Sequence, residues 1–328
     1  MTDRDFAPDF RNLASGGPSL EEYGRFQQHL VLLEDAGRIA SFRRAIESIP
    51  PGDTVMDVGA GTGVLALLAL RHGFRHAILV EPSRKMATYA RHLAALNGFE
   101  SRVTVVESRL EDIALDSLPS LDLVVSETLS SFIFGFGSWD ALPQLARRVR
   151  DPRHVIPYRG TLLIAPVERA MASRGPDTDG LKLLAEAGVR IDLFERAFRS
   201  AGNVYDKAST ARALARGEAV ATELASFDFA ASTPFSLSRG TTLRPPLGGA
   251  AVGALVFWDI QLSALRADDV FTNLDPRVTS WFPYYVAFRR PVDTATSVTL
   301  ELVPCDAPYT YAFRLMGDGE PLTHTLYW

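Results

Sequence analysis

Three glycines at alternate positions make up the most informative segment of the sequence. They lie in Gly59-Ala60-Gly61-Thr62-Gly63, between a predicted strand and a predicted helix. Glycine suits such a turn because the backbone must bend sharply and approach a ligand more closely than a Cβ would allow. The GxGxG spacing differs from the GxGxxG fingerprint of dinucleotide sites, where the helix N-terminus holds a pyrophosphate. The segment predicts a ligand site, and a tight turn that binds nothing is the alternative.

Two acidic residues beside this turn indicate which ligand it would hold. Asp57 lies on the strand just before the glycines, where a carboxylate would repel a pyrophosphate but would suit an amino group. Glu81 ends the second predicted strand, where an acidic side chain can accept hydrogen bonds from both ribose hydroxyls. A positively charged nucleoside without phosphates fits this combination better than NAD does.

A third acidic position follows the next predicted strand, in Ser108-Arg109-Leu110-Glu111-Asp112. A carboxylate just beyond that strand can accept a hydrogen bond from the exocyclic amine of an adenine. Taken alone, this segment is better explained as a solvated acidic loop. Because it accompanies the glycine turn and Glu81, we predict that Leu110 and Glu111 contact an adenine.

Glu127 follows the fourth predicted strand. Open α/β sheets bind their ligands beyond the carboxyl ends of the strands. A carboxylate at that place can orient an acceptor N–H or O–H group and receive its proton. Glu127 is therefore the predicted catalytic residue, with a structural hydrogen-bonding role as the alternative.

The elements that position these residues alternate between strand and helix. Continuous apolar strands joined by helices are typical of a parallel sheet covered on both faces. We therefore predict an α/β fold: a helical segment at residues 1–46, broken near Gly37, and a Rossmann-like domain at residues 47–157. The predicted strands are residues 54–58, 77–81, 103–106 and 121–125, and the predicted helices are residues 62–70 and 83–97.

The pattern changes beyond Pro157, where strand-like runs are separated by clusters of Gly, Pro and Asp. This texture predicts an antiparallel β-barrel domain over residues 158–328, with a helical insert at about residues 179–217. The insert is amphipathic, which suits a dimerisation arm or an intramolecular lid. The predicted strands are residues 161–167, 222–229, 251–262, 284–288 and 297–303.

Composition excludes several classes of protein. The net charge of −5 provides no basic field for a phosphate backbone, so we do not expect nucleic acid as a partner. No apolar run is long enough to span a membrane, and the charged N-terminus is unlike a signal peptide, so we expect a cytoplasmic protein. With one cysteine and no His/Cys/Asp cluster at ligand spacing, we expect no metal.

Three segments resemble the protein arginine methyltransferase family. The helix from Tyr23 through His29 to Arg38 is similar to that family's Y-x-x-F-x-x-H-x-x-M-L-x-D-x-x-R segment. Ser126-Glu127-Thr128-Leu129 is similar to the start of its double-glutamate loop, and Thr279-Ser280-Trp281 to its Thr-His-Trp loop. The resemblance covers nearly the whole chain from about residue 23.

The resemblance implies an S-adenosylmethionine cofactor, and Arg38 would pair with the carboxylate of its methionine part. Arginine is the natural bidentate partner of a carboxylate, although Arg38 on a helix surface is the alternative. Tyr23, His29 and Trp281 would line the acceptor side, and His29 would act as a base or simply pack there. The resemblance further implies a head-to-tail homodimer formed by the helical arm.

The sequence departs from the family at two positions that bear on chemistry. Phe136 stands where the family has its second glutamate, and Ser280 replaces the histidine of the Thr-His-Trp loop. A guanidinium stays protonated because its pKa is above about 12, and losing one partner of a buried charge pair costs roughly 3–5 kcal/mol. An arginine acceptor would need another carboxylate, for which Asp140 is the nearest candidate. Otherwise the site suits a neutral acceptor lying against Phe136.

Three functions follow from this pattern. The first is a methyltransferase that modifies a nitrogen or oxygen of a small-molecule or peptide acceptor. The second is an arginine or guanidino N-methyltransferase with a remodelled carboxylate pair. The third is a cofactor-binding partner protein without catalysis.

Overall fold

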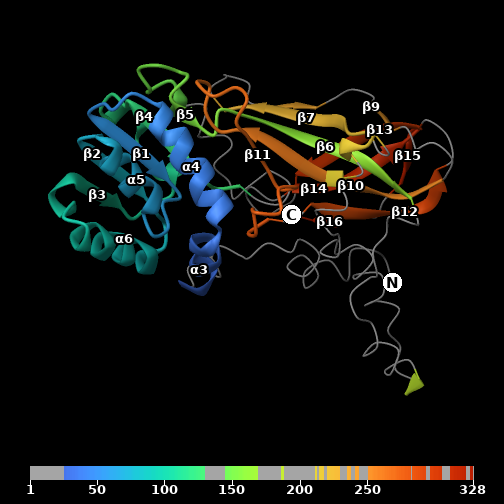
Figure 1. Ribbon diagram of the computed structural model, residues 1–328, viewed down its shortest axis with the longest axis horizontal. Helices are drawn as coiled ribbons and strands as arrows, with labels where there is room; N and C mark the ends of the chain where they lie inside the picture. The colour runs from blue at the N-terminus through green and yellow to red at the C-terminus, as the bar shows by residue number, and fades with distance from the viewer. Residues whose placement is uncertain are drawn as a thin grey trace.

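The computed structural model describes residues 26–129, 145–168, 186–187, 211–212, 214–217, 220–229, 235–237, 241–243, 250–281, 283–292, 296–304, 311–322 and 326–327. Figure 1 shows an α/β region built from the N-terminal half and an elongated antiparallel β region beside it. Helix α4 lies between the two. Most of the predicted arm at residues 179–217 lies outside the described residues.

Two helices open the described chain, α3 (Phe26–Glu34) and α4 (Ala36–Ser48). The break between them falls at Asp35, so the predicted break near Gly37 was placed too late. Asp35 adopts an extended conformation, and its side chain accepts a hydrogen bond from the backbone N–H of Arg38, which caps α4. The capping carboxylate therefore determines where the second helix begins.

A five-stranded parallel sheet forms the centre of the α/β region, in the order β3-β2-β1-β4-β5. Helices α5 (Val64–His72) and α6 (Arg84–Leu96) connect its first strands. Strands β1, β2 and β4 are almost fully buried, as predicted for a sheet covered on both faces, whereas the edge strand β3 is only half-buried. The strands are β1 (Thr54–Val58), β2 (His76–Val80), β3 (Val103–Val106), β4 (Leu123–Ser126) and β5 (Val155–Ile156), with 3-10 helices at Glu100–Arg102, Leu110–Asp112 and Leu115–Ser117.

The chain changes sheets between Ile156 and Arg159, beside the predicted domain boundary at residue 157. The described strands beyond this point form two antiparallel sheets. One contains β11-β10-β6-β7-β8, with β12 also paired to β10, and the other contains β15-β14-β13-β9, with β16 paired to β14. The strands are β6 (Arg159–Glu168), β7 (Thr222–Asp228), β8 (Phe235–Leu237), β9 (Thr241–Leu243), β10 (Ala251–Gln261), β11 (Val270–Thr272), β12 (Tyr284–Val292), β13 (Thr296–Pro304), β14 (Tyr311–Gly317), β15 (Glu320–Pro321) and β16 (Leu326–Tyr327).

One hydrophobic core runs through both regions of the molecule. Aromatic rings connect α4 to the antiparallel sheet, because Phe42 packs edge-on against Phe271 with ring centroids 5.8 Å apart. Phe271 in turn contacts Trp258 at 5.2 Å and Trp281 at 5.9 Å. Such ring pairs bury a large apolar area, so α4 is held firmly against β10 and β11. Among the described helices, none is long and apolar enough to cross a membrane.

Candidate functional site

The predicted site residues meet at the carboxyl ends of neighbouring parallel strands. In the register of the sheet, Val58 at the end of β1 pairs with Val80 on one side and with Ser126 on the other. Glu81 and Glu127 come directly after those two residues, so they flank the glycine turn that follows β1. The sheet therefore brings together acidic side chains that are 46 positions apart in the sequence.

The glycine turn has the backbone conformation that the sequence predicts. Gly59, Gly61 and Gly63 have φ angles of 68°, 53° and 78°, a region that residues with a Cβ rarely adopt. The amides of Gly59 and Ala60 donate to the carbonyl of Val80 at 2.9 and 3.0 Å, which fixes the turn against β2. The turn is thus built into the sheet.

Close neighbours surround the first two glycines of the turn. A Cβ on Gly59 would lie 2.7 Å from Cγ2 of Thr128, the residue after Glu127. A Cβ on Gly61 would lie 2.6 Å from Cε1 of the His29 ring on α3. The ring of His29 therefore lies against the turn and brings α3 to the site, and its role as a base or as a packed residue stays a prediction.

Asp57 is fully buried beneath the turn. Its Oδ2 accepts a hydrogen bond of 3.0 Å from the backbone N–H of Ala66 in α5. Burial raises the pKa of Asp57 from 3.8 to about 7, and the hydrogen bond from Ala66 and the charge of Arg38 oppose that rise. A cationic group beside Asp57 would favour its ionised form, as expected for a ligand's amino group.

Glu81 uses both carboxylate oxygens to shape the backbone around the turn. Oε2 accepts from the amide of Gly61 at 2.8 Å, and Oε1 accepts from the amide of Ser83 at 2.7 Å. Burial raises its pKa, and these two hydrogen bonds oppose the rise. Each carboxylate oxygen can accept a second hydrogen bond, so the predicted contacts with ribose hydroxyls remain compatible with this arrangement. The sequence did not reveal the role of Glu81 in holding Gly61.

Arg38 and Glu127 form a buried ion pair. Nη2 of Arg38 lies 2.5 Å and Nε lies 3.1 Å from the same oxygen, Oε2 of Glu127. Nη1 of Arg38 donates to the carbonyl of Leu32 at 3.1 Å. The side chains of Arg38 and Glu127 are only 5% and 7% exposed. Burial raises the pKa of Glu127, and Arg38 opposes that rise.

This pair leaves capacity for a ligand on both sides. A guanidinium has five N–H donors, and the described acceptors use only some of them. Oε1 of Glu127 accepts no hydrogen bond from any described residue. One oxygen of Glu127 is thus held by Arg38, and the other can still accept a hydrogen bond from a ligand. The sequence assigned both residues to the site but gave no sign of their contact.

The segment predicted to contact adenine begins a 3-10 helix, Leu110–Asp112, after β3. Leu110 is buried in the core, and Glu111 is half-buried. Glu111 is therefore partly accessible beside a fixed apolar residue, which is compatible with the predicted adenine contact. That contact stays a prediction.

The predicted acceptor side is only partly described. Trp281 is buried, and its ring lies 6.0 Å from that of Trp258. Tyr23, Phe136 and Asp140 lie outside the described residues. Within the described stretches of the chain, no group of His, Cys, Asp and Glu could hold a metal ion.

Asp35 is a buried site residue that the sequence analysis missed. Its Oδ2 accepts from the amides of Thr279 and Ser280, each at 2.8 Å, and so joins the start of α4 to the β region. An aspartate just before an apolar-periodic run is a typical N-cap signal and could have indicated the helix start. Nothing local in the sequence could indicate a contact with residues so distant along the chain.

A cavity of about 730 Å³ lies elsewhere, against the β region. Phe257 and Asp259 on β10 line it, whereas Trp258 between them packs toward Phe271 and α4. Alternate residues of a strand point to opposite faces. The cavity therefore opens on the face of the sheet away from α4, and it does not belong to the glycine-turn site.

Comparison with known proteins agrees with this geometry. Residues 55–152 match the family described as "Methyltransferase domain". Protein arginine N-methyltransferase 1 of Saccharomyces cerevisiae is 35% identical over 114 residues, which are 34% of this chain and 32% of that protein. Its counterpart in Dictyostelium discoideum is 27% identical over 168 residues, 50% of this chain and 49% of that protein. The matched sequence thus spans less than two thirds of these relatives.

The fold is similar over nearly the whole chain. The structure of Arabidopsis thaliana protein arginine methyltransferase 10 gives a TM-score of 0.69 at 18% identity, covering 94% of this chain and 99% of that one. The Trypanosoma brucei PRMT1 enzyme–prozyme heterotetrameric complex with AdoHcy gives 0.63 at 17% identity, covering 93% and 98%. The chain therefore contains a methyltransferase domain, resembles protein arginine methyltransferases in sequence, and has their fold.

Proposed function

We propose that this relative of the protein arginine methyltransferases binds S-adenosylmethionine and transfers its methyl group to a nitrogen or oxygen of a small-molecule or peptide acceptor. The observation that carries the proposal is the buried Arg38–Glu127 pair beside the glycine turn. A paired arginine and a carboxylate with one oxygen left open suit a ligand carboxylate on one side and an acceptor proton on the other.

The residues around the turn fit this cofactor. Gly59 and Gly61 allow the turn to pack closely against Thr128 and His29, as a Cβ would not, and buried Asp57 suits a cationic amino group. Glu81 would accept from the ribose hydroxyls, Glu111 from the adenine amine beside Leu110, and the remaining donors of Arg38 would bind the carboxylate. Thr62 and Gly63 complete the turn. When bound there, the cofactor supplies a methyl group on a positively charged sulfur, ready for in-line attack.

Glu127 would perform the protein's share of the transfer. Its Oε1 orients the acceptor N–H or O–H group and receives the proton as the methyl is accepted. The raised pKa of Glu127 makes it a better proton acceptor than an ordinary carboxylate. Holding the two reactants in attack geometry would contribute most of the rate, because such positioning can lower a barrier by up to about 7–11 kcal/mol.

The charges near Glu127 favour a neutral acceptor. Arg38 already balances Glu127, and both oxygens of Asp35 accept backbone amides. Because Asp57 and Glu81 are assigned to the cofactor in this proposal, a cationic guanidinium at Glu127 would meet no further carboxylate among the described residues that is not already engaged. Bringing it into a buried site without one costs several kcal/mol.

The proposal is tested by incubating the protein with methyl-labelled S-adenosylmethionine and a mixed library of peptides and small molecules. Mass spectrometry should find products one methylene heavier. Glu127→Gln should lose turnover, whereas Glu107→Gln, at an exposed ion pair with Arg91, should keep it. Absence of any product, or equal rates for the two variants, would remove the proposed role of Glu127.

An arginine acceptor is the second candidate, favoured by the relatives that are themselves arginine N-methyltransferases. It requires a second carboxylate, and we propose Asp140 for that role. Product on arginine that disappears in Asp140→Asn would support this candidate over a neutral acceptor facing Phe136. A third candidate, a partner protein without catalysis, would bind the cofactor and give no product.

We also propose that two copies of the chain assemble through the arm at residues 179–217. The arm lies in the sequence between β6 and β7, which are neighbouring antiparallel strands inside the sheet, so it is an insertion between two paired strands. The related Trypanosoma brucei structure is a heterotetrameric complex. A cytoplasmic location and the absence of nucleic-acid and membrane partners stay predictions from the sequence.

A further inference from the structure

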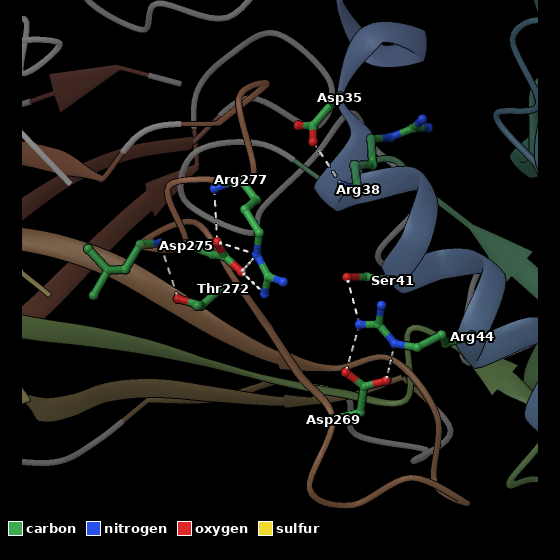
Figure 2. Close-up of polar contacts among 9 residues, drawn as sticks. Asp35, Arg38, Ser41, Arg44, Asp269, Thr272, Asp275 and Arg277 are labelled. Atoms are coloured by element: carbon green, nitrogen blue, oxygen red, sulfur yellow. Dashed lines mark hydrogen bonds and ion pairs between the residues drawn. The ribbon is translucent and has the colours of Figure 1, made fainter. Parts of the chain in front are cut away.

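Asp35 is a completely buried carboxylate whose bonds all go to the backbone. Oδ1 accepts from the amide of Arg38 at 2.8 Å, and Oδ2 accepts from the amides of Thr279 and Ser280, each at 2.8 Å. Figure 2 shows Asp35 at the first turn of α4, beside Arg38. One carboxylate therefore connects the helix that carries Arg38 with a loop of the β region.

The loop is in direct backbone contact with the same helix turn. A Cβ on Gly37 would lie 2.6 Å from the carbonyl oxygen of Arg277 and 3.0 Å from the amide nitrogen of Val278. Trp281, at the end of the loop, packs its ring against Phe271. The loop at residues 277–281 is thus fitted closely onto the start of α4, with no space for adjustment at Gly37.

A second contact, further along α4, also holds this helix to the β region. Arg44 binds both carboxylate oxygens of Asp269, at 2.9 and 3.0 Å. Figure 2 shows that this ion pair lies away from Asp35. This ion pair is partly exposed and lies away from Arg38. It fastens the helix without touching the loop at 277–281, so it provides a matched control.

We propose that Asp35 is a positioning residue that sets the place of the loop at 277–281 relative to Glu127. Arg38 follows Asp35 by less than one turn of the helix and pairs with Glu127. A ligand that displaces Arg38 therefore also displaces the start of α4, where Asp35 is the cap. Asp35 passes that displacement to the amides of Thr279 and Ser280. The link between cofactor binding and the acceptor side rests on the proposed function, whereas the attachment of the loop does not.

Ser280 marks the loop as belonging to the acceptor side. Its Oγ is buried and has no hydrogen-bond partner among the described residues. A buried hydroxyl without a partner is costly unless something else satisfies it. An acceptor bound near the loop would do so only if the loop is correctly placed.

Asp35→Ser separates the attachment of the loop from the capping of the helix. Serine caps helices about as well as aspartate, but its single short hydroxyl cannot also reach Thr279 and Ser280. Amide hydrogen exchange measured by mass spectrometry on peptides covering 277–283 should become about tenfold faster or more in Asp35→Ser, because two charge-assisted hydrogen bonds are lost. Asp269→Asn should leave exchange in those peptides unchanged.

The second measurement adds S-adenosylhomocysteine, the cofactor product, as the probe. In the wild-type chain, it should slow exchange at 277–283 further. In Asp35→Ser it should still bind by calorimetry yet no longer slow that exchange, which a purely structural role of Asp35 would not produce. Equal exchange in all three proteins, or faster exchange in Asp269→Asn alone, would overturn the attachment.

A failure of this proposal can be distinguished from a failure of the proposed function. If the wild-type chain does not bind the probe, the methyltransferase proposal fails, and the exchange in the absence of probe still decides the role of Asp35. If Asp35→Ser does not fold, the wild-type chain decides: Thr279 is exposed and its amide donates to Asp35, so we expect that hydrogen bond to be what slows its exchange. Fast exchange of that amide would contradict the proposal.

Discussion

The Arg38–Glu127 pair shows at the level of single residues why one carboxylate is difficult to replace. Burying two charges is unfavourable unless each satisfies the other, and removing one partner leaves the other uncompensated. In this site the same guanidinium also has donors left for a ligand carboxylate. Arg38 therefore contributes both to the stability of the protein and, in the proposed function, to ligand binding.

We expect Glu127→Gln to lower the free energy of unfolding of the ligand-free protein, by roughly 3 kcal/mol, because Arg38 loses its counter-charge. S-adenosylhomocysteine should stabilise this variant more than it stabilises the wild type, since its carboxylate replaces the missing partner. Urea unfolding with and without the ligand measures both effects. The same ligand-induced stabilisation in the two proteins would show that Arg38 does not bind the carboxylate.

The raised pKa of Asp57 predicts that both the stability of the protein and its affinity for the ligand depend on pH. The pKa rises from 3.8 to about 7 on burial, so the folded chain favours the protonated form. Protonated Asp57 therefore contributes to the free energy of unfolding. This contribution is fully present below pH 3.8 and is lost as the pH rises through about 7. A cationic ligand favours the ionised form, so its affinity should rise over the same range near neutrality.

Asp57→Asn should therefore be more stable than the wild type at pH 8 without ligand, because no buried charge has to form. Its affinity for S-adenosylhomocysteine should be lower and should vary less between pH 6 and pH 8, a range chosen to span the pKa of about 7. Calorimetry at several pH values gives the affinities. A parallel pH dependence in the variant and the wild type would place the titration on another group.

At the level of elements, periodicity predicted the position of most long strands and helices. Strand β1 (Thr54–Val58) has the predicted bounds, and Ser83 caps α6 where the predicted helix begins. Short strands such as β9 (Thr241–Leu243) and β11 (Val270–Thr272) were not predicted. Three residues are too few to show a period, and such strands depend on pairing partners far away in the sequence.

The residues of the candidate site also fall into those that local sequence could locate and those whose contacts it could not. The glycine turn, Glu81 and Glu127 could be located because their chemistry accompanies a local strand-to-helix pattern. The contacts of Arg38 with Glu127 and of Asp35 with Thr279 could not, because they join elements that only the folded chain brings together. Local sequence therefore predicted which groups lie together at the candidate site but not how they pair.

The contact between α3 and the glycine turn leads to a matched pair of substitutions. Gly61 and Gly98 both have positive φ, at 53° and 74°, so alanine should cost each about 1–2 kcal/mol of stability. A Cβ at Gly61 would also meet the ring of His29, whereas nothing lies within 4 Å of one at Gly98. Gly61→Ala should therefore lose affinity for S-adenosylhomocysteine, and Gly98→Ala should keep it.

Thermal unfolding and calorimetry of the two variants check this expectation together. Equal losses of affinity would mean that the backbone strain, and not the contact with His29, governs binding. Retained affinity in both would indicate that α3 moves away from the turn when the ligand binds.

At the scale of the whole molecule, α4 and its aromatic contacts unite the parallel sheet with the antiparallel region. Trp258 and Phe271 belong to the antiparallel strands, yet they pack in the same core as Phe42 of α4. Near the end of the segment between β6 and β7, Leu214 packs against a second, smaller cluster that includes Phe257 and Leu274. The sequence predicted that insert by its amphipathic pattern, and its proposed role is assembly.

Replacing residues 179–210 by a short Gly/Ser linker should leave the fold intact, because β6 and β7 pair directly and Ile164 stands opposite Thr222. We expect the variant to unfold at nearly the temperature of the wild type, because the two strands that flank the replaced segment pair directly with each other. Light scattering coupled to size-exclusion chromatography should find one chain per particle, against two for the wild type. If both proteins show the same number of chains, the arm does not hold the assembly together; a large drop in melting temperature would instead make the arm integral to the fold.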